Sequence, residues 1–267
     1  MELSRFVVEC NTALLSDGGR VALEYLTKER GLTLETIKDN SIGFCSSTQT
    51  LPGEGWIDRS TGKHRNPNEP LRNKVILPIY SEFGEVVAVA GRHPDKNTKG
   101  WWNMKFDKSH HIFLFNKSRR HIFEGNKAYV FEGYLDGITL RQNGLLSVGA
   151  IMGTSLGCRR IGLLSRYCDR VCLVFDNDKP KPVQQDMPKR INPGLMGQLK
   201  SIFDLSTLGF GTISKIDMPV GVDPDEFVIA YGLKAFEDKE YTLSKREIDE
   251  ARSRYLNIVE SSNGRDG

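Results

Sequence analysis

Between residues 127 and 232 the sequence alternates short apolar runs with helical segments, and this alternation restricts the fold more than any other feature. The apolar runs, each short enough for one buried strand, are 128–131, 145–151, 171–175 and 211–217. Helical segments follow them at 135–143, up to about 167, at 195–205 and at 224–232. Strands that alternate with helices form a parallel sheet with right-handed crossovers. We therefore predict an α/β fold with a parallel sheet flanked by helices.

Acidic residues follow three of these predicted strands. In order along the chain they are Glu132 and Asp136, then Asp176 and Asp178, then Asp223 and Asp225. Ligands of such sheets bind beyond the carboxyl ends of the strands, so these groups are expected to meet at one edge. Clustered carboxylates repel one another unless a cation neutralises them, and magnesium prefers hard oxygen ligands. The pattern predicts a divalent-metal site.

Each acidic group also has a structural explanation. Asp223 and Asp225 are placed to cap the helix that follows them, since acids favour helix N-termini. Asp176 and Asp178 are residue types typical of turns, and Glu132 with Gly133 fits a strand exit. Three acidic groups at three strand ends favour the metal site over three coincidences.

The segment before residue 127 differs in charge and texture. A helix is predicted over 20–30 and a short one over 34–38, whereas 46–70 is predicted to be a loop or irregular hairpin. The runs 74–80 and 85–92 predict a β-hairpin, with Pro78 favouring an edge position for the first strand. Residues 112–116 are interpreted as a strand and 118–121 as a turn.

Residues 59–120 hold thirteen basic and five acidic side chains, a net charge of +8 in a chain of net charge +3. The rest of the chain is therefore acidic, as expected if one part grips phosphates and another holds metal ions.

Composition narrows the class of protein. Hydrophobic residues make up 39% of the chain, enough for a folded core. The five cysteines are odd in number and scattered, which argues against a disulfide framework and fits a reducing compartment. No run approaches the roughly 18 apolar residues of a membrane span. We expect a cytoplasmic protein with no membrane partner.

Longer motifs resemble a known family. The strings VFEGYLDGITLRQNG, VGAIMGTSLG, LVFDND and DPDEF, in that order, resemble the TOPRIM fold of bacterial-type primases, type IA and II topoisomerases and some nucleases. The upstream strings ALEYLTKERGLTLETIKDNSIGF and LRNKVILPIYSEFGEVVAVAGR resemble the polymerase domain of bacterial-type (DnaG-like) primases. The resemblance covers roughly residues 20–232, and motifs of both subdomains occur in the expected order.

The resemblance implies roles for the acidic residues. Glu132 matches the family's essential glutamate, which ligates metal or takes a proton, and Asp136 matches the acid that follows it. Asp176, Asp178 and Asp225 match metal-binding aspartates, with Asp223 in support. The implied cofactor is Mg²⁺ or Mn²⁺, with Glu132, Asp176 and Asp178 as catalytic residues.

The resemblance also implies a nucleic-acid and nucleotide-binding set. It matches basic residues around the template and the incoming nucleotide, together with an aromatic-rich segment that ends in asparagine. The implied residues are Arg72, Lys74, Arg92, Lys99, Trp102, Asn103 and Lys108. Trp101 and Trp102 are adjacent, so in a strand they face opposite ways and at least one is expected in the core.

The chain departs from the family pattern in several respects, among them its short C-terminal portion. No zinc-binding module is present, because Cys168 and Cys172 lack a second pair and a nearby histidine, so no zinc is expected. Template selection then comes from elsewhere, or the chain is a fragment or a reduced, phage-like form. Residues 179–193, KPKPVQQDMPKRINP, are an insertion that we interpret as a loop.

We therefore predict a DNA primase that synthesises short RNA primers on single-stranded DNA, a nucleotidyltransferase. The predicted regions are a basic α+β subdomain at 1–125, a TOPRIM catalytic subdomain at 126–236, and a short helix with a frayed tail at 237–267. The expected partners are single-stranded DNA, ribonucleoside triphosphates, and a replicative helicase or a separate zinc-binding template-recognition protein. The alternatives are a TOPRIM nuclease, for which the basic subdomain is superfluous, and a catalytically silent DNA-binding module, which gains nothing from repulsive carboxylates.

Overall fold

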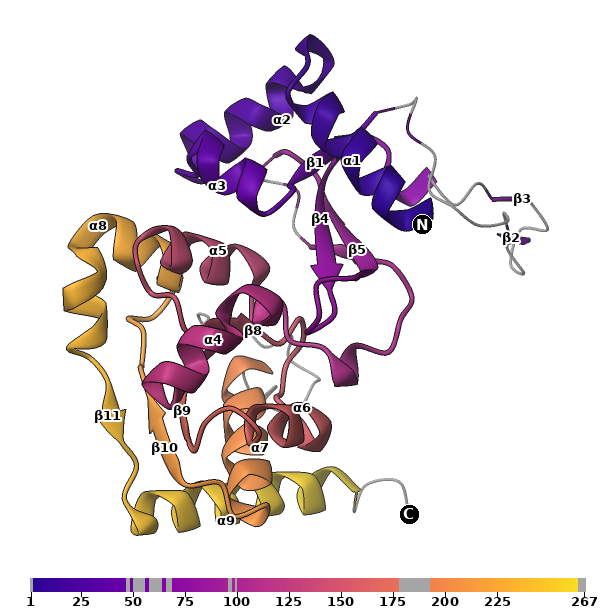
Figure 1. The fold of residues 1–267 in the computed structure, drawn as a ribbon. Coiled ribbons are helices and arrows are strands. Elements are labelled where there is room, and N and C mark those ends of the chain that lie inside the picture. Colours follow the sequence, from indigo (N-terminus) through magenta and orange to yellow (C-terminus); the bar gives the residue numbers. More distant parts are fainter. Residues whose placement is uncertain are drawn as a thin grey trace, which may run out of the picture. The chain divides into compact units, whose positions relative to one another are not determined.

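A computed structural model divides the chain into two compact units, residues 1–106 and 107–267. It describes residues 2–46, 49, 56–57, 64–65, 69–95, 98, 100–177 and 193–263 (Figure 1). Two predicted site residues, Lys99 and Asp178, lie outside the described residues, as does the insertion at 179–192. The described residues include no helix with the length and apolar character of a bilayer span.

The first unit packs helices on an antiparallel sheet. Its helices are α1 (Glu2–Leu14), α2 (Arg20–Glu24), which continues as a π-helical turn over Tyr25–Glu29, and α3 (Leu34–Asp39). Its strands are β1 (Gly43–Cys45), β4 (Lys74–Tyr80), β5 (Val86–Arg92) and β6 (Trp102–Asn103), in the spatial order β1-β4-β5-β6. A separate pair joins β2 (Trp56–Ile57) to β3 (His64–Arg65). The predicted helices and the β4–β5 hairpin are confirmed.

The edge position predicted for the strand that holds Pro78 is wrong, because β1 and β5 flank β4. The proline is tolerated because β1 is short and pairs only with Lys74 to Ile76. The missing amide of Pro78 therefore lies beyond the end of β1, and Pro78 pairs with Val89 on the other side.

Helix α1 was not among the predicted elements, yet it supplies much of the core of this unit. Three of its residues, Phe6, Val7 and Cys10, belong to one buried cluster. The same cluster includes Leu71, which precedes β4, and Val89 of β5. The close approach of β1 needs a glycine, since a Cβ at Gly43 would lie 2.5 Å from the Cβ of Cys10.

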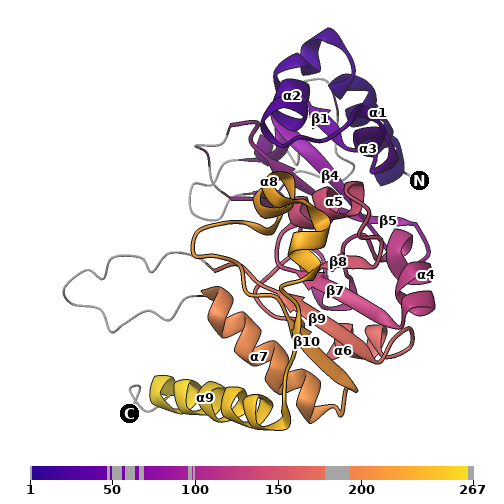
Figure 2. The ribbon, with the colours of Figure 1, turned by 90° about the vertical axis from the view of Figure 1, so that its left-hand side faces the viewer.

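The second unit is a sheet with helices on both faces (Figure 2). Its strands are β7 (Lys127–Phe131), β8 (Val148–Ala150), β9 (Arg170–Val174), β10 (Thr212–Lys215) and β11 (Tyr241–Thr242), in the spatial order β11-β10-β9-β7-β8. Strands β7 to β10 are parallel, and β11 joins β10 antiparallel. Its helices are α4 (Phe115–Gly125), α5 (Tyr134–Gln142), α6 (Cys158–Leu164), α7 (Pro193–Thr207), α8 (Pro224–Glu237) and α9 (Lys245–Asn263), after a 3₁₀ turn, η4 (Lys108–His110). The predicted α/β class and parallel sheet are confirmed.

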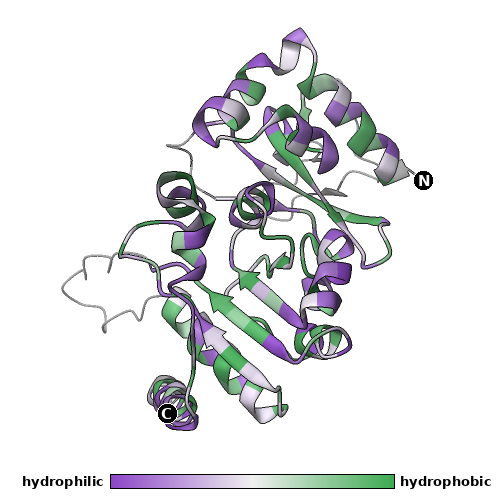
Figure 3. Cartoon of the chain, turned by 60° about the vertical axis from the view of Figure 1, so that its left-hand side comes forward, coloured by the Kyte–Doolittle hydropathy of each residue, from purple (hydrophilic) through white to green (hydrophobic). Residues whose placement is uncertain are grey.

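Alternate strand residues face two different layers, as the period of a strand requires. Val130, Leu173 and Ile213 belong to one cluster with residues of α4, α6 and α7. On the other face Phe131 stacks on Phe236 of α8, with ring centroids 6.3 Å apart. Figure 3 shows the central strands largely in the hydrophobic colour, as expected for strands buried on both faces.

The strand predicted at 112–116 and the turn predicted at 118–121 are wrong, because α4 covers Phe115–Gly125. Only Phe113 makes a β-bridge, to Ala150 of β8. Leu114 then adopts a left-handed conformation (φ 68°), which redirects the chain into the helix. Phe115 and Ile122 of α4 lie in the core of the sheet unit, so the compact units divide at 106/107 rather than at the expected 125/126. The functional assignment of the three regions stays a prediction.

Candidate active site

The carboxyl ends of β7 and β9 bring the first two acidic groups together. The strands are adjacent and parallel, with Phe131 level with Val174, so the residues that leave them emerge at the same edge. The Asp176 amide donates to Glu132 Oε1 at 3.3 Å. Glu132 is thereby held over the end of the neighbouring strand.

The loop that follows β10 is tied to the same edge. The Asn177 side-chain amide donates to the Met218 carbonyl at 2.9 Å, and the Gly221 amide donates to the Asn177 carbonyl at 2.9 Å. This loop leads into α8, where Asp223 is the N-cap residue and Asp225 lies in the first turn. Two hydrogen bonds therefore join the loop of Asp176 to the loop that carries Asp223 and Asp225.

Asp136 completes the cluster from α5. It is buried, 9% exposed, and stands in the first turn of the helix. Burial raises the pKa of Asp136 well above its ordinary value, and repulsion from Asp225, Asp176 and Asp223 raises it further. A hydrogen bond from the Asp225 amide offsets only part of this effect. The mutual repulsion shows that aspartates from three separate segments share one electrostatic environment.

The capping explanation of the last pair holds only in part. The side chain of Asp223 makes no capping hydrogen bond to α8 and is exposed. Asp225 is 4% exposed and its Oδ1 accepts from the Glu226 amide at 2.8 Å. A buried carboxylate that repels the Asp136 carboxylate is costly for stability, which points to a role other than capping alone.

The described cluster is not a preassembled ligand shell. Among the described residues, no three His, Cys, Asp or Glu side chains stand together in an arrangement that could hold a metal ion. The donor chemistry nevertheless suits a hard divalent cation, because the groups are carboxylate oxygens whose repulsion a cation relieves.

The predicted nucleotide-binding residues described in the first unit are Arg72 in the turn before β4, Lys74 on β4, Arg92 on β5, and Trp102 and Asn103 on β6. Arg72 is exposed, and Lys74 donates to the Pro70 carbonyl at 2.6 Å. The Arg92 guanidinium lies over the Trp101 ring, 5.5 Å from its centroid. Within the described part of the chain its buried Nε has no hydrogen-bond partner.

The side chains of the two adjacent tryptophans have different surroundings, as expected when successive residues of an extended chain face opposite ways. Trp102 of β6 pairs with Gly91 and packs against the cluster of Phe6 and Val89, whereas Trp101 contacts Arg92. Asn103 pairs with Ala90. A nucleotide-binding role for Trp102 and Asn103 stays a prediction.

Lys108 belongs to the second unit, where it begins the η4 turn. Burial lowers the pKa of its ammonium group, and the nearby positive charge of Arg160 lowers it further.

Arg160 is a buried cation that sequence reasoning missed. Its guanidinium donates to four carbonyls, those of Lys108 (2.7 Å), His111 (2.8 Å), Ser155 and Leu156 (both 3.2 Å). It therefore ties the η4 segment to the turn after β8. No sequence signal marks it, because its partners are main-chain atoms.

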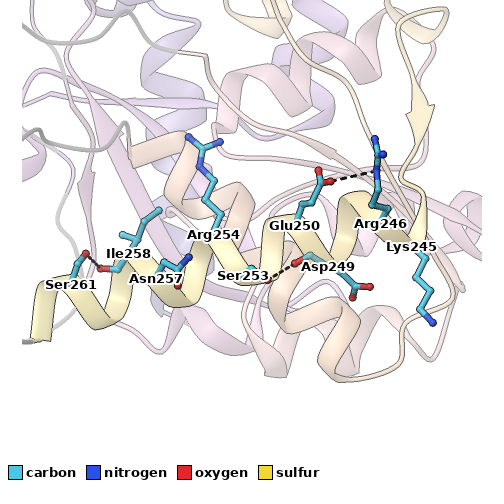
Figure 4. Close-up of a pocket in the computed structure, with 9 residues that line it drawn as sticks. All are labelled: Lys245, Arg246, Asp249, Glu250, Ser253, Arg254, Asn257, Ile258 and Ser261. Atoms are coloured by element: carbon cyan, nitrogen blue, oxygen red, sulfur yellow. Dashed lines mark hydrogen bonds and ion pairs between the residues drawn. The ribbon is translucent and has the colours of Figure 1, made fainter.

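A hollow of about 940 Å³ lies along α9, and Figure 4 draws the residues that line it. Its charged lining mixes both signs, with an ion pair of 3.4 Å between Arg246 and Glu250. None of the predicted site residues lines it, and we assign it no role.

Comparisons with known proteins agree with the resemblance seen in the sequence. Residues 129–180 match the Toprim-like family (Toprim_2). A DNA primase of Enterococcus faecalis is 29% identical over 246 residues, which are 82% of this chain and 36% of the relative. A DNA primase of Helicobacter pylori is 32% identical over 172 residues, 59% of this chain and 31% of the relative. The chain thus spans about a third of the length of the curated relatives it matches.

Solved structures show the same fold. The Aquifex aeolicus primase, comprising zinc-binding and RNA polymerase domains, gives a TM-score of 0.75 at 22% identity and covers 96% of this chain and 66% of that one. A DnaG primase catalytic domain bound to single-stranded DNA gives 0.74 at 22% identity, over 95% of this chain and 83% of that one. The predicted fold, a TOPRIM-type parallel sheet preceded in the chain by a smaller α+β part, is confirmed by these similarities.

Proposed function

We propose that this chain, which resembles bacterial-type (DnaG-like) DNA primases in sequence and in fold, is itself a primase catalytic core. It joins ribonucleotides into short RNA primers on single-stranded DNA, and it is a DNA-directed RNA polymerase and nucleotidyltransferase. The observation that carries the proposal is the meeting of the acidic segments at one edge of the sheet, where the Asp176 amide bonds Glu132 and the Asn177 side chain bonds the loop that leads to Asp223 and Asp225.

The carboxylates of this edge would hold the divalent cation. We assign this role to Glu132, Asp136, Asp176, Asp223 and Asp225, and keep Asp178 from the family pattern although it lies outside the described residues. When bound, Mg²⁺ or Mn²⁺ would polarise the reacting phosphate, favour attack by a 3′-hydroxyl, and stabilise the leaving pyrophosphate.

Neighbouring groups of the protein determine the protonation of Asp136 and hold the other carboxylates in position. Asp136 retains a proton to a higher pH than an exposed aspartate, because burial and three like charges raise its pKa. Glu132 keeps one oxygen against the Asp176 amide, which fixes its carboxylate over the ends of β7 and β9. The ties from Asn177 and Gly221 keep the α8 loop in place beside them.

The partners follow from the same proposal. Single-stranded DNA is the template, consistent with a structural relative that was solved bound to single-stranded DNA. Ribonucleoside triphosphates are the substrates, with Arg72, Lys74, Arg92 and Lys108 as candidates for phosphate contacts. A replicative helicase or a separate zinc-binding protein is the expected partner for template selection, and the cytoplasm of a bacterium or an infected host is the expected location.

The test compares two Asp→Asn variants at the same sheet edge. Asp176→Asn removes one member of the cluster, whereas Asp217→Asn removes a carboxylate that follows β10 but bonds Lys215 and Tyr241 instead. With single-stranded DNA, four ribonucleotides and Mg²⁺, the native protein and D217N should yield short RNA products. D176N should lose about 100-fold or more of the rate, as expected when one preorganised charged group is removed.

The results separate the proposal from its alternatives. DNA cleavage without RNA synthesis would support a TOPRIM nuclease. Binding of DNA with neither reaction would support a silent binding module. Equal activities of D176N and D217N would contradict the assigned site.

A further inference from the structure

The turn that joins β8 to α6 lies at the same edge of the sheet as the carboxylates. We call residues 152–157, Met-Gly-Thr-Ser-Leu-Gly, the 152–157 turn. The Ile151 amide donates to the Phe131 carbonyl at 2.9 Å, so the turn begins beside the residue that precedes Glu132. A group bound at this turn would therefore neighbour the proposed reaction site.

The first amides of this turn have no partner in the protein. Within the described residues, no hydrogen-bond acceptor meets the main-chain amides of Met152, Gly153, Thr154 or Ser155. Gly153 and Thr154 are exposed, so the turn is open to a ligand. Successive free amides in a turn form a concave site for anions.

The carbonyl of Thr154 faces α7, and this fixes the direction of the following amide. The Thr154 carbonyl abuts α7 so closely that a Cβ at Gly197 would lie 1.6 Å from its oxygen. The C=O and N–H groups of a trans peptide point in opposite directions, and no cis peptide occurs in the described chain. The Ser155 amide therefore points away from α7. Tight packing of the turn explains the inward carbonyl, but it does not require the amides to be free.

Arg160 adds a positive charge behind the turn. It is 7% exposed and holds the carbonyls of Ser155 and Leu156. In the described part of the chain its hydrogen bonds go to carbonyls, and no carboxylate forms an ion pair with it. A buried guanidinium without a contacting counter-ion raises the positive potential of its surroundings, which favours an anion nearby.

The left-handed conformation of Met152 fits this arrangement. Its φ is 56° and its side chain is buried, so the chain bends at a fixed point directly after β8. Gly153 and Thr154 follow this bend and are exposed.

We propose that the 152–157 turn binds a phosphate group of the incoming ribonucleoside triphosphate, with Arg160 as the positioning residue that orients the turn. This inference rests on the proposed function, because that function supplies the triphosphate. The reacting phosphates must lie beside the carboxylates, and the turn begins next to them. The template backbone, by contrast, is expected to meet the basic residues of the first unit.

The test removes a single amide. Ser155→Pro eliminates the outward N–H, and Ser155→Ala is the matched control that keeps it. The affinity of each variant for ATP and for inorganic triphosphate, with Mg²⁺, is measured by titration calorimetry. S155A should bind like the native protein, whereas S155P should bind at least about 10-fold more weakly, as expected for the loss of one hydrogen bond to a charged group.

A second pair of variants controls for local misfolding caused by the proline. If S155P lowers the unfolding temperature more than S155A does, Thr154→Pro and Thr154→Ala are compared in the same way. Gly153 precedes that proline and accommodates the backbone that proline imposes on its neighbour. Arg160→Met should also weaken triphosphate binding if the guanidinium orients the turn.

The outcomes distinguish this inference from the proposed function. Single-stranded DNA binding, followed by fluorescence anisotropy, should be equal in S155P and S155A. Native triphosphate affinity in both proline variants overturns the inference, and so does a loss confined to DNA binding. If the native protein makes no primers but the Pro and Ala variants still differ in triphosphate affinity, the proposed function fails and the phosphate site stands.

Discussion

The importance of the position of the Asp136 carboxylate can be tested by substituting Gly133, which lies next to it. Gly133 has φ −93° and ψ 151°, an extended conformation that alanine adopts without backbone strain. A Cβ at this position would lie 2.2 Å from Asp136 Oδ2 and 3.4 Å from its Cγ. Contacts under 3.0 Å essentially never occur for a real Cβ, so in Gly133→Ala the carboxylate must move by about 1 Å.

A displacement of that size is expected to cost activity much more than stability. A misplacement of about 1 Å at a reacting centre lowers the rate by about 100-fold. The backbone stays compatible, and loss of the glycine's freedom in the unfolded chain favours folding by about 0.4–1 kcal/mol. Gly133→Ala should therefore unfold at nearly the native temperature while making primers about 100-fold more slowly.

The control is the same substitution where space is open. Gly162 lies inside α6, and a Cβ there would meet nothing within 4 Å. Gly162→Ala should keep full activity and gain about 0.5–1 kcal/mol from helix propensity. Primer synthesis and thermal unfolding are measured for both variants. Native activity in Gly133→Ala would refute the reasoning, because the assigned position of Asp136 would then not matter.

Two further predictions concern Glu240, which accepts from Lys127, from Tyr129 at 2.9 Å and from Ser214 at 2.7 Å. Lys127 and Glu240 are only 15% and 17% exposed, so Glu240→Gln should lower the free energy of unfolding by about 2–4 kcal/mol in urea titrations. Glu250→Gln, which removes an exposed partner of an i,i+4 pair, should change it by less than about 0.5 kcal/mol, and equal losses would contradict a buried network. Burial opposes ionisation of Glu240, but the hydrogen bond from Lys127, followed by those from Ser214 and Tyr129, lowers its pKa below the ordinary 4.5 overall. The stabilisation by ionised Glu240 is therefore complete above about pH 4.5 and is lost as the pH falls through the lower folded pKa. The difference in unfolding free energy between the native and E240Q proteins should accordingly narrow below about pH 4.5. A difference that widened there would count against the assignment.

The sheet and the place of the acids were predictable because both follow from local periodicity. Apolar runs of strand length, separated by helices, allow few arrangements other than a parallel sheet, and parallel strands necessarily end at one edge. Glu132 and Asp176 are brought together in this way. The contact of Asp136 with Asp225 depends on how α5 and α8 pack, which residue spacing alone does not determine.

The missed helices show where local reading fails. The run at 112–116 is apolar in succession, which suits a buried strand as well as a helix, and tertiary packing made Phe115 the first residue of α4. Phe115, Ser118 and Ile122 are the buried residues of that helix, a helical spacing that was present in the sequence. Arg160 gives no such signal, because an arginine in a short helix is usually solvated and its carbonyl partners are visible only in the fold.

The sheet of the second unit is bounded by very short strands, two residues in β11 and three in β8. The outer side of β8 is further occupied by Phe113, whose amide and carbonyl both bond Ala150. Neither border thus presents a long row of vacant amides and carbonyls to another polypeptide. The flanks of the sheet thereby discourage the strand-to-strand association that leads to aggregates, and they do so without covering the end of the sheet where we propose that the reaction occurs.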